Sequence, residues 1–469
     1  MFACWPWRLW LLLLFATDCR SMGLRSQEHQ RASRIPSQFS KEERVAMKET
    51  LKGAIQIPPV SFGPEESNTT ALAEFGGYIY KVFPTVLSTS FNQHEVMGEY
   101  SHLFTVQGSD PSLQPCLLLA HFDVVPAPAE GWEVPPYSGL ECDGFVNGWG
   151  TLDDKNSVMA FLQDLELLSF FISLGHDEEK ISALLQSRGI QLTFIVDEGS
   201  FIFDGFIPDL KNPFAMIANS ENGSMNLMLS VESSFYLPPP PLQTTSWGLC
   251  FSSRLEQTPL PNMFGSWTLT VTLEQLAYEL PFPANIILSN LWLFKPLVSR
   301  YLERNYITNA MVGTTTALTM FNAGVKVTSL VLSIRGVGTV YSRQLFQHQR
   351  IVADDRVQFH VLSAFDPLPI SPYDDKALGY QLLRQTIQSV FPEFNTITPG
   401  NDFITDTTNL TTGIYRFSAI HLQPEVFRSI HGIHEKISVQ AYENQVKFFF
   451  ELIQNADTDK EPVSHQHKL

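Results

Sequence analysis

Three short apolar stretches of the chain each end in acidic residues or histidine. The residues that follow them are His121 and Asp123 after positions 116–120, Glu178 and Glu179 after 169–174, and Asp197 after 191–196. Adjacent carboxylates repel one another unless a cation or a shared proton lies between them. A solvated acidic turn that opens a helix is an ordinary explanation for one such group, but it would have to apply three times. The recurrence therefore indicates a site for a divalent cation.

His121 and Asp123 are two positions apart. If the strand continues through them, both side chains point to the same face. In that geometry a carboxylate can hold a metal-ligating imidazole by its second ring nitrogen. Asp153 and Asp154 follow a glycine-rich turn and precede an apolar helical pattern. For His121 alone a surface histidine is the simpler interpretation, whereas the whole group favours a functional site.

A further candidate ligand, His431, lies in an Ile-His-Gly turn in the C-terminal part of the chain. A turn of this kind can present an imidazole to a metal ion. His434 is an alternative ligand, and an ordinary core or surface position would explain either histidine.

The apolar stretches that carry these residues are typical of buried parallel strands in an α/β sheet. Ligands in such sheets bind outside the carboxyl ends of the strands, which is where the acidic residues lie. Helices are expected at 42–55, 72–83, 158–168, 375–390 and 438–453. The helix at 158–168 runs directly into the strand at 169–174, although helix-to-strand connections normally contain a few residues.

A chain of 469 residues predicts two domains. Changes of pattern divide it into a signal peptide (1–23), a flexible arm (24–44), a first part of an α/β catalytic domain (45–225), a smaller α+β domain (226–349), a second catalytic part (350–455) and a tail (456–469). The central sheet is expected to be mostly parallel. The smaller domain would therefore interrupt the catalytic domain.

The apolar run at 9–16 suits the core of a signal peptide and is too short to span a bilayer, so we expect a secreted, extracellular protein with no stable membrane span. An uncleaved anchor is the alternative. Asn68, Asn222 and Asn409 begin glycosylation acceptor patterns, of which Asn68 has the most polar surroundings. A formal charge of -17 and the lack of clustered Lys and Arg argue against a nucleic-acid partner.

Five motifs occur in a fixed order along the chain. They are H-F-D-V-V-P from His121, G-T-L-D-D-K from Gly150, G-H-D-E-E from Gly175, I-V-D-E-G from Ile195 and H-G-x-x-E-K-I from His431. Together they resemble the co-catalytic-zinc peptidase family that includes aminoacylase and carboxypeptidase S. The resemblance implies an α/β catalytic domain interrupted by a lid or dimerisation domain, so a homodimer is an open alternative.

The resemblance also implies roles for individual residues. The zinc ligands would be His121 and Asp197 for one ion, Glu179 and His431 for the other, and Asp153 as the bridge between two Zn²⁺ ions. Asp123 would orient His121, and Glu178 would act as the general base. Within the family the chain is most similar to secreted members that hydrolyse, and reversibly form, the amide bond of N-fatty-acyl amino acids. Its partners would be small lipid–amino acid conjugates.

The chain departs from the family pattern at the positions that handle substrate. The lid histidine that polarises the substrate carbonyl is replaced near Tyr236, and the carboxylate-binding Arg is absent from residues 400–406. Lys180 leads straight into a helix where the family has a glycine-rich turn after the Glu-Glu pair. Two alternatives therefore accompany the amidase hypothesis: a catalytically impaired homologue that keeps the fold, and a secreted carboxypeptidase or dipeptidase.

Overall fold

The structure of the chain is a computed structural model. It describes residues 37–458 except for 64–65, 89–91, 107–112, 129, 166–170, 175–177, 233–252, 256, 259, 261, 266–267, 305, 324–326, 337–340, 356, 395 and 403–409. Residues 1–43 and 44–469 form separate compact units. The expected signal peptide, most of the expected arm and residues 459–469 of the expected tail lie outside the described residues. Within these ranges, no helix combines the length and apolar character needed to cross a membrane.

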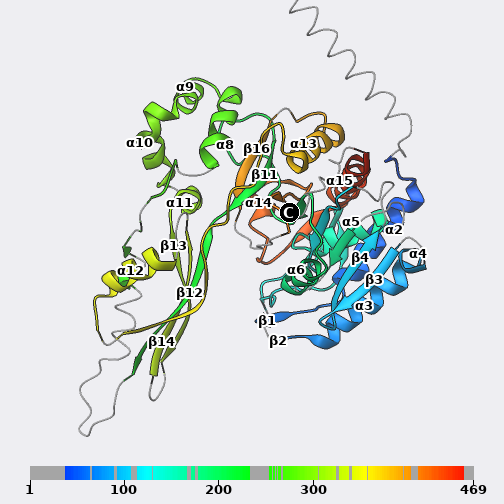
Figure 1. The fold of residues 1–469 in the computed structure, drawn as a ribbon, viewed down its shortest axis with the longest axis horizontal. Coiled ribbons are helices and arrows are strands. Elements are labelled where there is room, and N and C mark those ends of the chain that lie inside the picture. The colour runs from blue at the N-terminus through cyan, green and yellow to red at the C-terminus, as the bar shows by residue number, and fades with distance from the viewer. Residues whose placement is uncertain are drawn as a thin grey trace, which may run out of the picture. The chain divides into compact units, whose positions relative to one another are not determined.

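A ten-stranded mixed sheet forms the centre of the first domain (Figure 1). Its order is β18 (His421–Leu422), β10 (Ile202–Phe203), β11 (Phe214–Glu221), β17 (Ile414–Arg416), β9 (Ile195–Asp197), β5 (Leu117–Ala120), β8 (Phe171–Leu174), β4 (Ser101–Val106) and β3 (Asn92–Met97), with β16 (Ile397–Asp402) paired to β11. The four neighbours β8, β5, β9 and β17 run parallel. Their carboxyl ends therefore meet at one edge, as the sequence predicts. The expected α/β class is confirmed.

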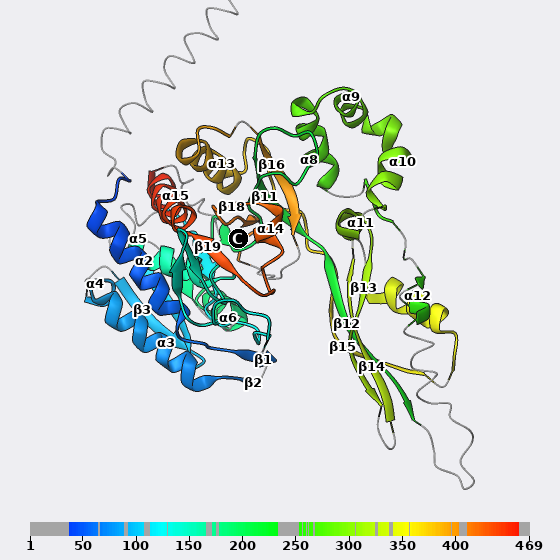
Figure 2. The same cartoon turned by 180° about the vertical axis from the view of Figure 1, so that it is seen from behind.

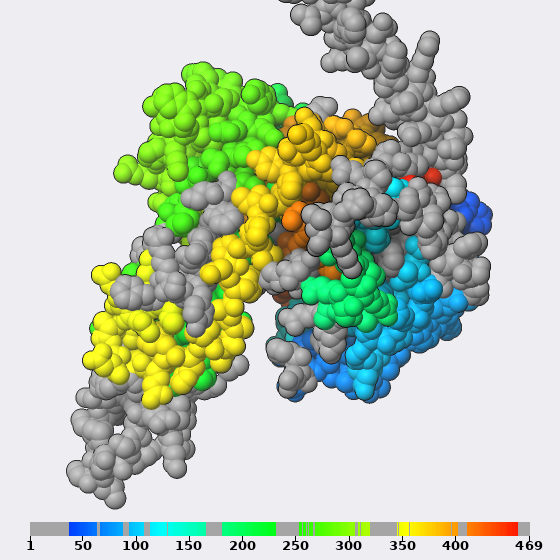
Figure 3. Space-filling view, viewed as in Figure 1, coloured from blue at the N-terminus to red at the C-terminus, as the bar shows by residue number. Residues whose placement is uncertain are grey.

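The apolar strand residues are buried under helices. On one face, Ile181 and Leu185 of α6 (Glu178–Ser187) pack with Leu117, Leu119 and Ile195 of the sheet. The outer surface of α6 is exposed (Figure 3). This packing fixes where α6 begins, next to the carboxyl ends of the strands.

A second group of helices lies together at the same sheet (Figures 1 and 2). It comprises α5 (Lys155–Leu165), α13 (Leu378–Val390) and α15 (Val439–Thr458). The rings of Phe161 and Phe449 meet edge to face, with centroids 4.5 Å apart. The described part of α5 starts and ends three residues before the expected helix at 158–168. The first two helices of the described residues, α2 (Lys41–Ile55) and α3 (Thr69–Val82), closely match the expected positions.

The inserted domain contains a separate antiparallel sheet of four strands. Its order is β13 (Thr315–Ala323), β14 (Val327–Gly336), β12 (Gly223–Glu232) and β15 (Gln358–Phe365), accompanied by α8 (Leu269–Leu276), η1 (Ala277–Glu279), α9 (Ala284–Ser289), α10 (Leu291–Leu302), α11 (Tyr306–Val312) and α12 (Tyr341–Val352). β15 pairs with β12, so residues 358–365 lie in this sheet and not in the second catalytic part that was expected from residue 350. Its alternating pattern predicts a strand but does not identify the sheet that it joins.

A small three-stranded sheet brings distant segments of the first domain together. It consists of β19 (Lys436–Ser438), β7 (Phe145–Asn147) and β6 (Leu140–Cys142). Pairing of Lys436 with Asn147 places the turn at 148–154 beside the loop at 431–435. The remaining elements are β1 (Ser61–Gly63), β2 (Glu66–Ser67), α4 (Pro84–Ser88) and α14 (Pro424–Phe427).

Candidate metal centre

His121 follows β5 at the carboxyl edge of the parallel strands and contacts three acidic residues. Its Nδ1 lies 3.0 Å from the backbone oxygen of Asp123 and 3.4 Å from the Asp123 carboxylate. The hydroxyl of Ser61 donates to the other oxygen of that carboxylate at 2.7 Å. On the opposite side of the ring, Nε2 lies 3.1 Å from Asp153 and 3.2 Å from Glu198. Asp123 is therefore placed to orient the ring, and Nε2 faces the acidic cluster.

Asp153 lies between two histidines. Its Oδ1 faces His121, and its Oδ2 is in direct contact with Nε2 of His431. His431 adopts a positive φ of 55°, a conformation that histidine tolerates better than most residues, and Gly432 follows it. Asp153, the expected bridging residue, thus contacts one histidine from each of the two chain segments that form the first domain. His434 contacts the amide of Glu133 instead, at 3.4 Å.

Glu435 joins the two loops that carry these ligands. Its carboxylate accepts hydrogen bonds from the amides of Gly150 at 3.2 Å and Leu152 at 2.7 Å, and from the Thr151 hydroxyl at 3.3 Å. Burial raises the pKa of Glu435 to about 7, against the lowering effect of the Leu152 amide. The motif H-G-x-x-E-K-I contains this residue, but the sequence alone did not indicate its role.

The structure brings Glu198, and not the expected Asp197, to His121. The Asp197 carboxylate instead lies 3.5 Å from Nε of Arg416, and Arg416 reaches Glu221 at 3.3 Å. Successive residues at a strand end point to opposite faces, so only one of Asp197 and Glu198 can face the cluster. The sequence feature that could have identified Glu198 is its position next to Asp197 in the I-V-D-E-G motif.

Glu178 and Glu179 are the first residues of α6, which follows β8 on the strand next to β5. Their side chains, and residues His176 and Asp177, lie outside the described part of the chain. The same holds for Tyr236 and for residues 403–406. The expected base and the expected ligand at Glu179 therefore stay predictions.

The residues present fit a divalent metal ion. Ligand atoms of His121, Asp153 and Glu198 all lie within 4.8 Å of one another, and one imidazole with two carboxylates is a donor set that Zn²⁺ accepts. Burial raises the pKa of Glu198 to about 8. Burial alone would lower the pKa of His121, but Glu198, Asp123 and Asp153 raise it well above its usual value. A cation would offset the negative charge gathered here.

Comparison with known proteins identifies the family of the chain. The model of "Peptidase family M20/M25/M40" matches residues 117–455. The N-fatty-acyl-amino acid synthase/hydrolase PM20D1 of Homo sapiens is 67% identical over 98% of this chain and 97% of its own length, and that of Bos taurus is 63% identical over the same shares. The dipeptidase Dug1p from Saccharomyces cerevisiae shares the fold, with a TM-score of 0.61 at 13% identity, over 88% of this chain and 96% of that one.

The family resemblance drawn from the five motifs is confirmed by these matches. The matched region covers the inserted domain and the first domain from β5 onward. The chain belongs to the M20/M25/M40 peptidase family, whose members are metal-dependent hydrolases.

Proposed function

We propose that the protein hydrolyses the amide bond of N-fatty-acyl amino acids and forms it in the reverse reaction. The observation that carries the proposal is the position of Asp153, with one oxygen facing His121 and the other facing His431. The high identity to synthase/hydrolases over nearly the whole chain supports the choice of substrate.

Two zinc ions are the proposed cofactors. His121 and Glu198 would hold one, His431 the other with Glu179, and Asp153 would serve both. Bound zinc supplies Lewis-acid polarisation of the amide carbonyl and a water of lowered pKa. The cluster of buried acidic groups beside His121 supports a cation here, and the family pattern supports the number two.

The side chains of the protein position these groups and move the proton. With Nδ1 directed at the backbone oxygen and carboxylate of Asp123, the His121 ring keeps Nε2 as its metal-facing atom. Glu178 is the proposed general base, which takes a proton from water and delivers it to the departing amide nitrogen. Its place at the start of α6, next to the parallel strand ends, supports that role.

We further propose that the chain is secreted and carries a glycan at Asn68. The apolar run at 9–16 supports the first point. Asn68 is exposed at the start of α3, whereas Asn222 is buried and accepts a hydrogen bond from Asn401 at 2.8 Å. Mass measurement of the secreted protein before and after glycosidase treatment of wild type and Asn68→Gln tests both points. Equal masses would contradict the glycan.

One experiment separates the proposed amidase from an impaired homologue. Zinc content per chain and hydrolysis of N-oleoyl-phenylalanine are measured on the same purified secreted sample. Two zinc ions with turnover are expected. Zinc without turnover would support the impaired homologue, for which the missing lid histidine and Arg are the motivation, because one lost oxyanion donor typically lowers turnover by about 10²–10³.

A carboxypeptidase or dipeptidase is the second candidate within the enzyme class, since the fold is shared with a dipeptidase. Unblocked dipeptides assayed beside N-oleoyl-phenylalanine distinguish the two. A preference for the dipeptides would reject the acyl-amino-acid assignment. A homodimer through the inserted domain stays a prediction, and light scattering on the same sample measures it.

A further inference from the structure

Four phenylalanine rings gather beside β10 and β18, at one edge of the first sheet. They belong to Phe201, Phe203, Phe206 and Phe427, which we call the phenylalanine cluster. The Phe206 ring meets those of Phe203 and Phe427 edge to face, with centroids 5.0 and 5.5 Å apart. The rings of Phe201 and Phe427 meet in the same way, at 6.5 Å. The four side chains therefore form one continuous apolar surface.

The cluster is only partly covered by the rest of the protein. Phe427 is 38% exposed, and the other three side chains are half-buried. On the inner side, Phe203 packs against a small core of Phe214, Met216 and Leu276. Leaving aromatic rings in contact with water is unfavourable, and a contiguous exposed apolar surface commonly marks a site that binds another molecule.

The chain connects the cluster to the candidate metal centre at two points. Phe201 lies three residues after Glu198, one of the candidate ligands. Consecutive Cα atoms are 3.8 Å apart, so the Cα atoms of Phe201 and Glu198 are separated by at most about 11 Å. Phe427 lies four residues before His431, and its backbone oxygen accepts a hydrogen bond from the amide of Ile430 at 3.3 Å. Both segments of the cluster therefore lead directly to a candidate ligand.

This placement suits the apolar end of a long substrate whose amide lies at the metal centre. A separation of this size is beyond the reach of an acetyl group but within the reach of a long acyl chain. The four side chains carry neither charge nor hydrogen-bonding groups. They offer nothing to a polar ligand, whereas a hydrocarbon gains free energy by leaving water for such a surface.

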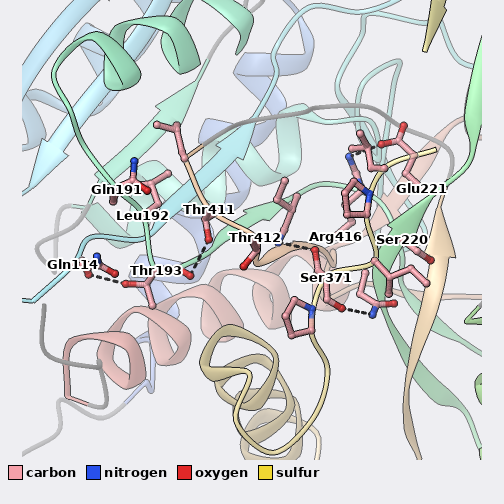
Figure 4. A pocket seen from close by; sticks show the side chains of 17 residues that line it. Gln114, Gln191, Leu192, Thr193, Ser220, Glu221, Ser371, Thr411, Thr412 and Arg416 are labelled. Carbon is pink, nitrogen blue, oxygen red and sulfur yellow. Dashed lines mark hydrogen bonds and ion pairs between the residues drawn. The ribbon is translucent and has the colours of Figure 1, made fainter. Parts of the chain in front are cut away.

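A cavity of about 940 Å³ elsewhere in the first domain has a different character (Figure 4). Most of its lining residues are polar or charged, including Glu221 and Arg416. The side-chain oxygen of Asn219, another lining residue, is buried and has no hydrogen-bond partner among the described residues. Placing hydrocarbon against polar groups is unfavourable because they lose their hydrogen bonds to water. The phenylalanine cluster is therefore the better surface for an acyl chain.

We propose that the phenylalanine cluster binds the acyl chain of N-acyl amino acids while the amide lies at the metal centre. The inference rests on the proposed function and assigns recognition of the acyl group to these four side chains. Each methylene that is buried against the rings should strengthen binding about fourfold. KM should therefore fall with increasing acyl length until the chain extends past the cluster.

The test compares the acetyl, octanoyl and oleoyl derivatives of phenylalanine as substrates of zinc-loaded full-length protein. Phe427→Gln and Phe206→Gln each place a polar amide in the cluster, from different chain segments, and Phe427→Leu keeps the surface apolar. Neither position is fully buried, so the variants should fold. Leu293→Gln, at an exposed apolar position of α10, is the matched control.

We expect the ratio of KM for the oleoyl substrate to KM for the acetyl substrate to rise about tenfold in both Gln variants. It should change by no more than about threefold in Phe427→Leu, and Leu293→Gln should keep the wild-type ratio. A wild-type dependence on acyl length in both Gln variants of the cluster would overturn the proposal.

A binding measurement separates this inference from the proposed reaction. If the wild type hydrolyses none of the substrates, binding of N-oleoyl-phenylalanine to the zinc-loaded protein is measured by equilibrium dialysis. Weaker binding by Phe427→Gln and Phe206→Gln, but not by Leu293→Gln, would then support the acyl site while rejecting the reaction. Equal binding by all four proteins, or no binding by the wild type, would reject the acyl site.

Discussion

The carboxylate of Glu435 accepts a hydrogen bond from the backbone amide of Leu152, at 2.7 Å. Leu152 precedes Asp153, and Glu435 lies four positions after His431, so one buried carboxylate holds both loops of the candidate metal centre. Partners of this kind commonly fix ligand geometry.

Replacing Glu435 with Gln should weaken metal binding and lower turnover by about 10–100-fold. The amide group of Gln cannot accept from all of the donors at Gly150, Thr151 and Leu152. Zinc release to a competing chelator measures the effect, with Glu425→Gln on the exposed surface of α14 as control. Zinc retention equal to that of wild type would show that Glu435 does not position the ligands.

Glu198→Gln and Asp197→Asn should change different properties of the protein: the zinc content and the free energy of unfolding, respectively. Glu198→Gln removes a carboxylate from His121 and should reduce the zinc bound per chain. Asp197→Asn should leave the zinc content unchanged but lower the free energy of unfolding by roughly 1–3 kcal/mol, because Arg416 is buried and loses one charged partner. Metal analysis and urea unfolding of both variants provide the measurements. Loss of zinc in Asp197→Asn alone would restore the assignment made from the motif.

His102 should make stability sensitive to acid. It is buried, its Nδ1 lies 3.0 Å from Nε2 of His94, and burial lowers its pKa to about 4. The unfolded chain binds this proton near pH 6.5, whereas the folded chain does not bind it until about pH 4. Stability is therefore lost as the pH falls through this window, by about 3 kcal/mol in total.

The variant His102→Phe should lose less stability than wild type between pH 6.5 and pH 4. It should also be less stable by about 1 kcal/mol at neutral pH, because the contact with His94 is lost. Urea unfolding at several pH values measures both effects, and His360→Phe at an exposed position is the control. Parallel stability curves for wild type and His102→Phe would contradict the prediction.

Removal of metal should lower the unfolding temperature as well as abolish activity. Zinc at a hundred times its dissociation constant stabilises the folded state by about 2.7 kcal/mol. His431 is exposed, so after chelation His431→Gln should lose only its contact with Asp153 and remain folded. Added zinc should then raise its unfolding temperature less than that of wild type. Equal responses to zinc would exclude His431 as a ligand.

The sequence predicts much of the first sheet, because its central strands are continuous apolar runs that end in polar residues. Periodicity locates such runs and helices such as α15, but it carries no information on pairing. The placement of β15 in the second sheet depends on its register with β12. That register is set by contacts between segments far apart in the chain, which a local pattern does not contain.

The sequence predicts which motifs form the candidate site, but it does not predict which residue of each motif faces the site. Asp197 and Glu198 are neighbours of the same charge, and the direction of each side chain depends on the backbone at the end of β9. The ion pair with Arg416 holds the side chain of Asp197 away from His121. No feature of the sequence near Arg416 predicts this contact. Glu435 was likewise part of a motif whose histidine is the more obvious ligand.

The contact between Asp153 and His431 joins positions 278 residues apart. During folding this is one of the slowest kinds of contact to form, because a very long loop must close first. Until then His121, Asp153 and Glu198 would lie together without His431, in an incomplete site with excess negative charge. Metal captured at that stage would relieve the repulsion and favour closure. Zinc supply should therefore set the yield of native protein on refolding, which a comparison of refolding with and without zinc would measure.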